Sequence, residues 1–207
     1  EKINNESLED VLFPQMIKLT NGKVVVSWFD NPTSGNSTGM FLRVLDRQGG
    51  ISNGTQYIQA NTTTNGIQAN GRLTALSSGG FLAVWESQSG QDGDGSGIFG
   101  QFFDADGNKS GVEFQINSFT SGDQKLASAI ELSNGNIIVS WNSDGQDGSG
   151  TGVFAKILAP HKETLKGVKD NFSSSNGSEN ASISTGLQAH INSTFPSSSA
   201  VDFDNNA

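Results

Sequence analysis

The sequence predicts an all-β protein built from repeated four-stranded units that form a propeller-like array or a stack of sheets. Two observations carry this prediction. Three similar segments end in tryptophan, at Trp28, Trp85 and Trp141, which lie 57 and 56 residues apart. No window of eleven or more residues has the apolar period of a helix, and 26 glycines interrupt the chain. Repeats of this length are typical of propeller blades and other stacked β arrays.

The first two strands of each unit are predicted to form a hairpin. In the third unit, residues 125–132 lead through Asn134 and Gly135 into residues 136–141. Asn-Gly between two apolar runs favours a tight hairpin turn, because both residues tolerate a positive φ. The strands that end in tryptophan are apolar at consecutive positions, so both of their faces are expected to be covered.

A glycine-rich loop follows each tryptophan and leads to the third and fourth strands. In the second unit, these strands are expected near residues 98–104 and 113–117, joined by a turn at residues 104–108. Phe41, Phe99 and Phe154 occupy equivalent positions in the three units. Recurring aromatic residues on apolar strands are typical of a core, so these side chains are expected to pack inside.

The ends of the chain are expected to differ from the repeat. Residues 1–10 are predicted to be an N-terminal edge strand, residues 11–166 the β-repeat domain, and residues 167–207 a Ser/Asn-rich tail. Polar and apolar residues alternate over about 183–195, which predicts a strand with one buried face. Three complete units are too few to close a propeller. The two ends therefore look like the edges of a fourth unit, in which residues 200–204 would begin the second strand.

Composition excludes several function classes. The chain has 21 acidic and 12 basic residues, for a formal net charge of −9, and this balance argues against nucleic-acid binding. It has no cysteine and no apolar run near the roughly 20 residues that span a bilayer, so neither a disulfide scaffold nor a membrane span is expected. His161 and His190 lie far apart, and no nucleophile motif or apolar pair of carboxylates is evident. No catalytic residue, and no enzyme, is predicted.

Two kinds of modification or ligand site are predicted. Nine N-x-S/T sequons, about twice the number expected by chance, suggest N-linked glycans on a secreted protein, against the alternative that an Asn/Ser/Thr-rich sequence produces them incidentally. The sequon asparagines are Asn5, Asn36, Asn53, Asn61, Asn108, Asn171, Asn176, Asn180 and Asn192.

The glycine-rich loops of units two and three place oxygen-bearing side chains at alternate positions. Such side chains can converge on calcium, whereas the alternative is a hairpin loop without an ion. The candidate ligands are Asp92, Asp94, Ser96, Asp144, Asp147 and Ser149.

Residues 84–124 and 132–158 both contain the motif QDGxGxG(I/V)F, which V-x-W-x-S precedes at residues 139–143 and EFQIN follows at residues 113–117. They resemble the tandem repeats of very large secreted surface and adhesin-like proteins, which often accompany RTX-type calcium-binding repeats. The resemblance covers about residues 8–158. It implies an extracellular propeller-like array that binds calcium at Asp92, Asp94, Asp144 and Asp147.

The sequence therefore suggests a secreted, N-glycosylated structural protein that self-assembles, in the form of a filament subunit joined by strand complementation. The motivation is the ordered-looking tail strand and the mismatched ends of the repeat. The alternative is a calcium-dependent adhesin or lectin-like module that binds carbohydrate through its glycine-rich loops. Both hypotheses place the protein outside the cell, at or beyond the cell surface.

Overall fold

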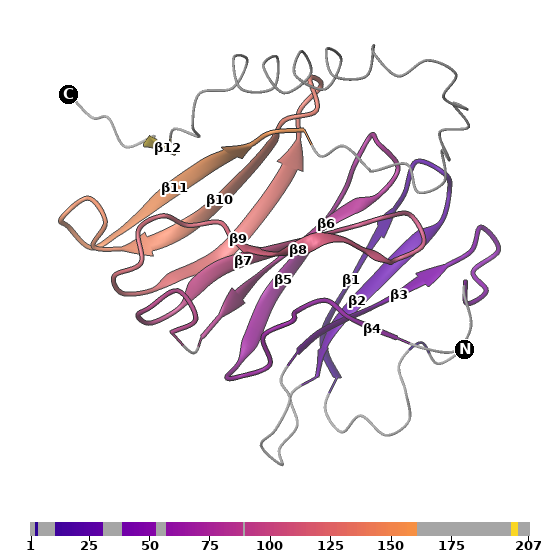
Figure 1. Cartoon of the computed structure of the whole chain (residues 1–207), viewed down its shortest axis with the longest axis horizontal. Helices are drawn as coiled ribbons and strands as arrows, with labels where there is room; N and C mark the ends of the chain where they lie inside the picture. Colours follow the sequence, from indigo (N-terminus) through magenta and orange to yellow (C-terminus); the bar gives the residue numbers. More distant parts are fainter. Residues whose placement is uncertain are drawn as a thin grey trace, which may run out of the picture. The chain divides into compact units, whose positions relative to one another are not determined.

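The computed structural model of the chain describes residues 3, 11–30, 39–52, 57–88, 90–160 and 200–202. These residues form twelve strands in three four-stranded sheets (Figure 1). They contain no helix long and apolar enough to cross a membrane. The predicted all-β architecture of repeated four-stranded units is confirmed.

Each sheet is an antiparallel meander. Sheet A consists of β1 (Val11–Lys18), β2 (Val24–Asp30), β3 (Gly39–Leu45) and β4 (Ile58–Gln59). Sheet B consists of β5 (Gln68–Ala75), β6 (Phe81–Ser87), β7 (Gly97–Phe103) and β8 (Lys109–Gln115). Sheet C consists of β9 (Gln124–Glu131), β10 (Ile137–Asp144), β11 (Thr151–Leu158) and β12 (Ala200–Asp202).

The outermost strand of sheet C has an unusual origin. In sheets A and B, the fourth strand follows the third directly in the chain, whereas β12 comes from residues 200–202. Its residues pair with β11, Ala200 opposite Lys156 and Asp202 opposite Phe154. The prediction that residues 200–204 begin the second strand of a further unit is therefore wrong, because they complete the edge of sheet C. The predicted strands at 183–195 and in residues 1–10 lie outside the described residues, apart from Ile3.

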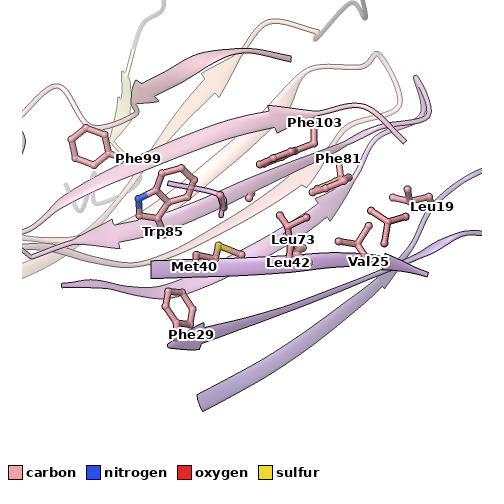
Figure 2. Packing of buried hydrophobic residues seen from close by; sticks show 13 residues of the cluster. Leu19, Val25, Phe29, Met40, Leu42, Leu73, Phe81, Trp85, Phe99 and Phe103 are labelled. Carbon is pink, nitrogen blue, oxygen red and sulfur yellow. The ribbon is translucent and has the colours of Figure 1, made fainter. Parts of the chain in front are cut away.

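Hydrophobic cores lie between consecutive sheets. Between sheets A and B, Met40 and Leu42 of β3 meet Phe81 and Trp85 of β6 (Figure 2), and all four side chains are 0% exposed. Phe81 also stacks on Phe103, with ring centroids 4.8 Å apart. Neighbouring sheets therefore pack apolar face against apolar face. The strands that are apolar at consecutive positions predicted this arrangement.

The core between sheets B and C repeats this arrangement. Leu82 and Ile98 of sheet B pack in the same cluster as Trp141 and Phe154 of sheet C. Trp85 of sheet B thus faces sheet A, and Trp141 of sheet C faces sheet B. Because its two faces enter the two cores, sheet B is covered on both sides.

The connections fall at two ends of the sheets. At one end are tight turns, such as residues 19–23, 76–80 and 132–136. At the other end, called here the loop end, are the glycine-rich loops at residues 88–96 and 145–150 and the first residues of β5 and β9. Hydrogen bonds between Asp94 and Gly122 and between Ser96 and Asp123 join sheets B and C at the loop end.

The first strand of every sheet carries an irregularity at the same place. Phe13, Asn70 and Leu126 have φ values of 54°, 52° and 58°, and each lies fifteen residues before the tryptophan of its unit. The strand register shifts there in all three sheets. Residues other than glycine rarely adopt this conformation, so the repeat preserves a strained β-bulge near the loop end.

Candidate functional site

Ionisable side chains gather at the loop end where sheets B and C meet. The Lys125 Nζ atom lies 2.6 Å from Asp123 Oδ2. This hydrogen bond raises the pKa of Lys125 and lowers that of Asp123. The negative charges of Glu86 and Asp144 raise the pKa of Lys125 further. Asp123 thus contacts the ammonium group of Lys125, whereas Glu86 and Asp144 act on it through their charges, and these four residues are called here the Lys125 cluster.

The strands explain why the cluster forms. Asp123 precedes β9, Lys125 is the second residue of β9, and Asp144 ends β10, so the meander of sheet C brings all three to one end. Asp123 also accepts a hydrogen bond from the Ser96 backbone N–H at 3.0 Å, which ties it to the loop of sheet B. Asp123 and Lys125 remain about 35% and 43% exposed, so a solute can reach both.

Glu86 is the buried member of the Lys125 cluster. Its side chain is 1% exposed, and its two oxygens accept hydrogen bonds from Asn70 Nδ2 at 2.9 Å and Gln88 Nε2 at 2.6 Å. Burial of a carboxylate is costly unless such donors satisfy it. Asn70 is the bulge residue of sheet B, so the strained bulge directs a donor to this carboxylate.

The pair formed by Asn70 and Glu86 breaks the repeat. The residue after the tryptophan is Phe29 in unit one and Asn142 in unit three, and neither carries a charge. The bulge residues of those units, Phe13 and Leu126, are apolar and exposed. A departure from a repeat at two contacting positions indicates a local role that the other units do not share.

The predicted calcium ligands of the loop in sheet B do not converge. Asp92 Oδ2 accepts a hydrogen bond from Asn117 Nδ2 at 2.8 Å, whereas Asp94 Oδ2 accepts one from the Gly122 backbone at 3.0 Å. Ser96 is buried, and its backbone N–H donates to Asp123. The carboxylates therefore fasten the loop to two different segments.

The predicted ligands in sheet C are likewise used within their own loop. Asp144 Oδ1 accepts from Thr151 Oγ1 at 2.6 Å, and Asp147 Oδ1 accepts from the Ser149 backbone at 2.9 Å. Among the described residues, no group of three or more acidic, histidine or cysteine side chains could hold a metal ion. The candidate ligands of the two loops are thus engaged within the protein, and calcium binding stays a prediction.

Two of the nine sequon asparagines lie among the described residues. Asn108 is exposed in the turn before β8, where its Nδ2 donates a hydrogen bond to Asp104 Oδ2 at 2.8 Å. Asn61 is 2% exposed, accepts a hydrogen bond from the Met40 backbone at 3.0 Å and donates one to Thr63 O at 2.8 Å. The prediction of a glycan at Asn61 is therefore corrected, because its amide is buried and bonded on both atoms. The other seven sequons lie outside the described residues, as do His161 and His190.

Sequence reasoning missed Asn117, the counterpart of Asn61 in unit two. Its Oδ1 accepts from the Ile98 backbone at 2.8 Å, and its Nδ2 donates to Asp92, Phe119 and Gln124. The Gln-x-Asn shared by residues 59–61 and 115–117 was visible in the sequence, but nothing in the motif alone indicated that the asparagine is buried and bonded to the backbone. The Lys125 cluster was also missed, since its members come from three separate segments.

The sequence matches no protein-family model and no curated protein. The fold resembles solved glycoside hydrolases. An endo-arabinase from Bacteroides thetaiotaomicron VPI-5482 superposes with a TM-score of 0.52 at 14% identity, over 76% of this chain and 61% of the enzyme. An alpha-L-arabinofuranosidase from Lactobacillus brevis superposes with a TM-score of 0.50 at 9% identity, over 75% of this chain and 52% of the enzyme. The chain thus spans about three-fifths and about half of these proteins.

This likeness establishes a propeller-like fold of the kind found in five-bladed glycoside hydrolases. It also overturns two expectations. The self-assembling structural subunit, together with its adhesin alternative, and the exclusion of an enzyme are contradicted, because the proteins that share the architecture are enzymes. The expectation rested on the tail strand and the mismatched ends of the repeat, but a repeat fold is compatible with several kinds of function.

Proposed function

We propose that the chain is the propeller part of a carbohydrate-active protein that binds and hydrolyses a neutral polysaccharide of the arabinose-containing class. The observation that carries the proposal is the Lys125 cluster at the loop end, in which Asp123 contacts Lys125 and the charges of Glu86 and Asp144 act on the same ammonium group. Carboxylates and amines are the groups that bind sugar hydroxyls, and glycoside hydrolysis uses a pair of carboxyl groups. The fold shared with an endo-arabinase supports the substrate class.

The roles within the Lys125 cluster follow from exposure. Asp144 is exposed and Asp123 is partly exposed, so these two can contact a saccharide and serve as the acid and base pair. Lys125 donates hydrogen bonds to sugar oxygens and offsets part of the negative charge. Glu86 is buried and acts as a positioning residue, which holds the ammonium group through its charge. A net negative site disfavours acidic polysaccharides, so the substrate is uncharged.

Hydrolysis and binding are tested separately. The purified chain is incubated with linear arabinan, and new reducing ends are measured beside binding by calorimetry. Asp144→Asn is expected to abolish product formation, whereas the matched control Asp147→Asn, in the same loop, retains it. Binding without product would overturn the hydrolase part of the proposal. The absence of both binding and product would overturn the proposal as a whole.

We also propose that the protein acts outside the cell, where such polysaccharides occur, and carries a glycan at Asn108. The exposed Asn108 side chain in a surface turn supports this. Enzymatic deglycosylation of the secreted protein should lower its mass, and Asn108→Gln should remove the corresponding share of that loss. An unchanged mass in both measurements would contradict glycosylation at this residue.

A further inference from the structure

The bulge residues of the three first strands make different contacts. Phe13 is 63% and Leu126 is 57% exposed, whereas Asn70 is partly buried and donates a hydrogen bond from Nδ2 to Glu86 Oε2 at 2.9 Å. All three have a positive φ, a conformation that asparagine adopts with less strain than phenylalanine or leucine. Unit two therefore places, at a recurring irregularity, a residue that tolerates it and a donor that units one and three lack.

Glu86 connects this donor to the beginning of a loop. Its side chain is 1% exposed, so its carboxylate depends on donors from the protein. The second donor is Gln88 Nε2, which lies 2.6 Å from Glu86 Oε1. Gln88 is the first residue after β6, and its backbone N–H donates to Ile67 O at 2.8 Å. Glu86 thus ties the first strand of sheet B to the root of the loop at residues 88–96.

The same loop reaches the Lys125 cluster at its far end. The Gly90 N–H donates to Gly95 O at 2.9 Å, which closes the loop on itself. The next residue, Ser96, donates its backbone N–H to Asp123 Oδ1 at 3.0 Å. Asp123 Oδ2 in turn lies 2.6 Å from Lys125 Nζ. Hydrogen bonds and the loop backbone therefore lead from the bulge of sheet B to the pair formed by Asp123 and Lys125.

The equivalent loop of sheet C closes without such a pair. Leu126 at its bulge cannot donate a hydrogen bond from its side chain, and Asn142 in the position of Glu86 carries no charge. The loop is nevertheless closed in the same way, by a hydrogen bond from the Gly145 N–H to Gly150 O at 2.6 Å. The fold of the repeat therefore does not require the buried pair of unit two, which indicates a role beyond closing the loop.

We infer that Asn70 is a positioning residue of the saccharide site: through Glu86 it fixes the root of the loop at residues 88–96, and this loop holds Asp123 where a sugar can bind to it. The inference rests on the proposed function for its ligand, an uncharged saccharide, and on hydrogen bonds for its mechanism. Strained backbone is typical of sites where the aim of a side chain matters. Loss of the Asn70 amide leaves a buried carboxylate with one donor fewer, so the root of the loop is expected to loosen first.

Amide hydrogen exchange of the purified chain, followed by NMR without saccharide, tests the mechanism. Asn70→Gly removes the amide and also the strain, because glycine adopts a positive φ freely. Exchange at Ser96 and Gly122, which donate to aspartates at the loop end, is expected to become at least about tenfold faster by local opening. The Leu76 N–H, bonded in the tight turn at the other end of sheet B, should exchange at the wild-type rate. Equal acceleration of all three amides, or of none, would overturn the inference.

Two further variants sharpen this measurement. The matched control Phe13→Gly makes the same backbone change at the bulge of sheet A and should leave exchange at Ser96 and Gly122 unchanged. Glu86→Gln should accelerate the same two amides, and it decides the question should Asn70→Gly fail to fold. Asn70→Gly added to Glu86→Gln should have no further effect, because one residue acts through the other. Unchanged exchange in Glu86→Gln, or further acceleration in the double variant, would overturn the inference.

Calorimetric titration with linear arabinan separates this inference from the proposed function. Asn70→Gly is expected to bind at least about fivefold more weakly than the wild type, whereas Phe13→Gly binds equally. Equal affinity of Asn70→Gly and the wild type would overturn the inference and leave the proposed function standing. A wild type that binds no arabinan would overturn the proposed function, and the exchange rates would still decide whether Asn70 positions the loop.

Discussion

The asparagine two residues after the fourth strand makes the same hydrogen bonds in two units. Asn61 and Asn117 each accept a hydrogen bond from the backbone of the third strand, at Met40 and at Ile98. Each also donates to a backbone oxygen two residues ahead. A short amide side chain can satisfy two buried backbone groups at once, so it closes the unit without a longer turn.

Asn117→Ala is expected to lower the free energy of unfolding by about 2–3 kcal/mol, because the Ile98 N–H stays buried without an acceptor. Urea denaturation followed by tryptophan fluorescence measures the change. The control Asn108→Ala lies in an exposed turn and is expected to cost about 1 kcal/mol or less. Equal losses of unfolding free energy in the two variants would contradict this role of Asn117.

Asp123→Asn is expected to cost less than about 1 kcal/mol at neutral pH, since solvent screens the partly exposed pair with Lys125. Lys125 lowers the pKa of Asp123, so the ionised carboxylate stabilises the fold above its unfolded-state pKa. That contribution disappears as the pH falls through the lower folded-state pKa. Urea titrations should therefore show a difference from the wild type at neutral pH and none in strong acid. A difference that persists in acid would contradict this origin.

At this scale, the sequence indicated only part of the site. Aspartates in glycine-rich loops were recognisable, but their hydrogen-bond partners were not. Asp94 bonds to Gly122 and Asp92 to Asn117, which lie 28 and 25 residues away. Whether such an aspartate binds a metal ion or holds its loop by a hydrogen bond depends on which segments the fold brings near it. The spacing of residues along the chain does not contain that information.

Among the elements, the strands and turns were predictable and the bulges were not. Asn21-Gly22 and Asn134-Gly135 predict hairpin turns. Both glycines have the positive φ that such turns require. Phe13 and Leu126 adopt a positive φ with no glycine or proline at those positions to mark it. Packing of the first strand against its neighbours imposes the bulge, so tertiary structure overrides the local preference.

The two glycine-rich loops offer a matched comparison. Gly95 and Gly150 hold equivalent positions with φ of 58° and 54°. A Cβ at Gly95 would lie 2.4 Å from Gly122 O across the junction of sheets B and C, whereas one at Gly150 would meet nothing within 4 Å. Replacing either glycine by alanine is expected to destabilise the fold by about 1–2 kcal/mol, because alanine is strained in the left-handed backbone conformation.

Gly95→Ala is therefore expected to cost about 1–3 kcal/mol more than Gly150→Ala, because only the first forces a backbone shift. Thermal and urea unfolding of both variants measure this difference. Similar losses would mean that the junction at Gly122 yields without cost, which would contradict a tight contact between the loops of sheets B and C.

For the whole molecule, the repeat predicted how many sheets form but not how they end. The aligned tryptophans predicted three units, and the described residues form three sheets. Nothing in the residues around 200 distinguished the outermost strand of sheet C from the start of another unit, because a three-residue strand carries too little pattern. Function was misjudged at this scale for a related reason, since a fold of stacked sheets is compatible with enzymes and with structural arrays.

A stack of sheets is stabilised mainly by its nearest-neighbour interfaces, so equivalent positions should differ in cost according to what covers them. Leu82 and Ile138 are equivalent, but Leu82 is 0% exposed between sheets B and C, whereas Ile138 is half-buried on the open face of sheet C. Leu82→Ala is expected to cost about 2–5 kcal/mol, and Ile138→Ala about 1 kcal/mol or less. Urea unfolding of the purified chain measures both. Equal costs would mean that the chain itself covers this face, and that its third sheet is not an end of the stack.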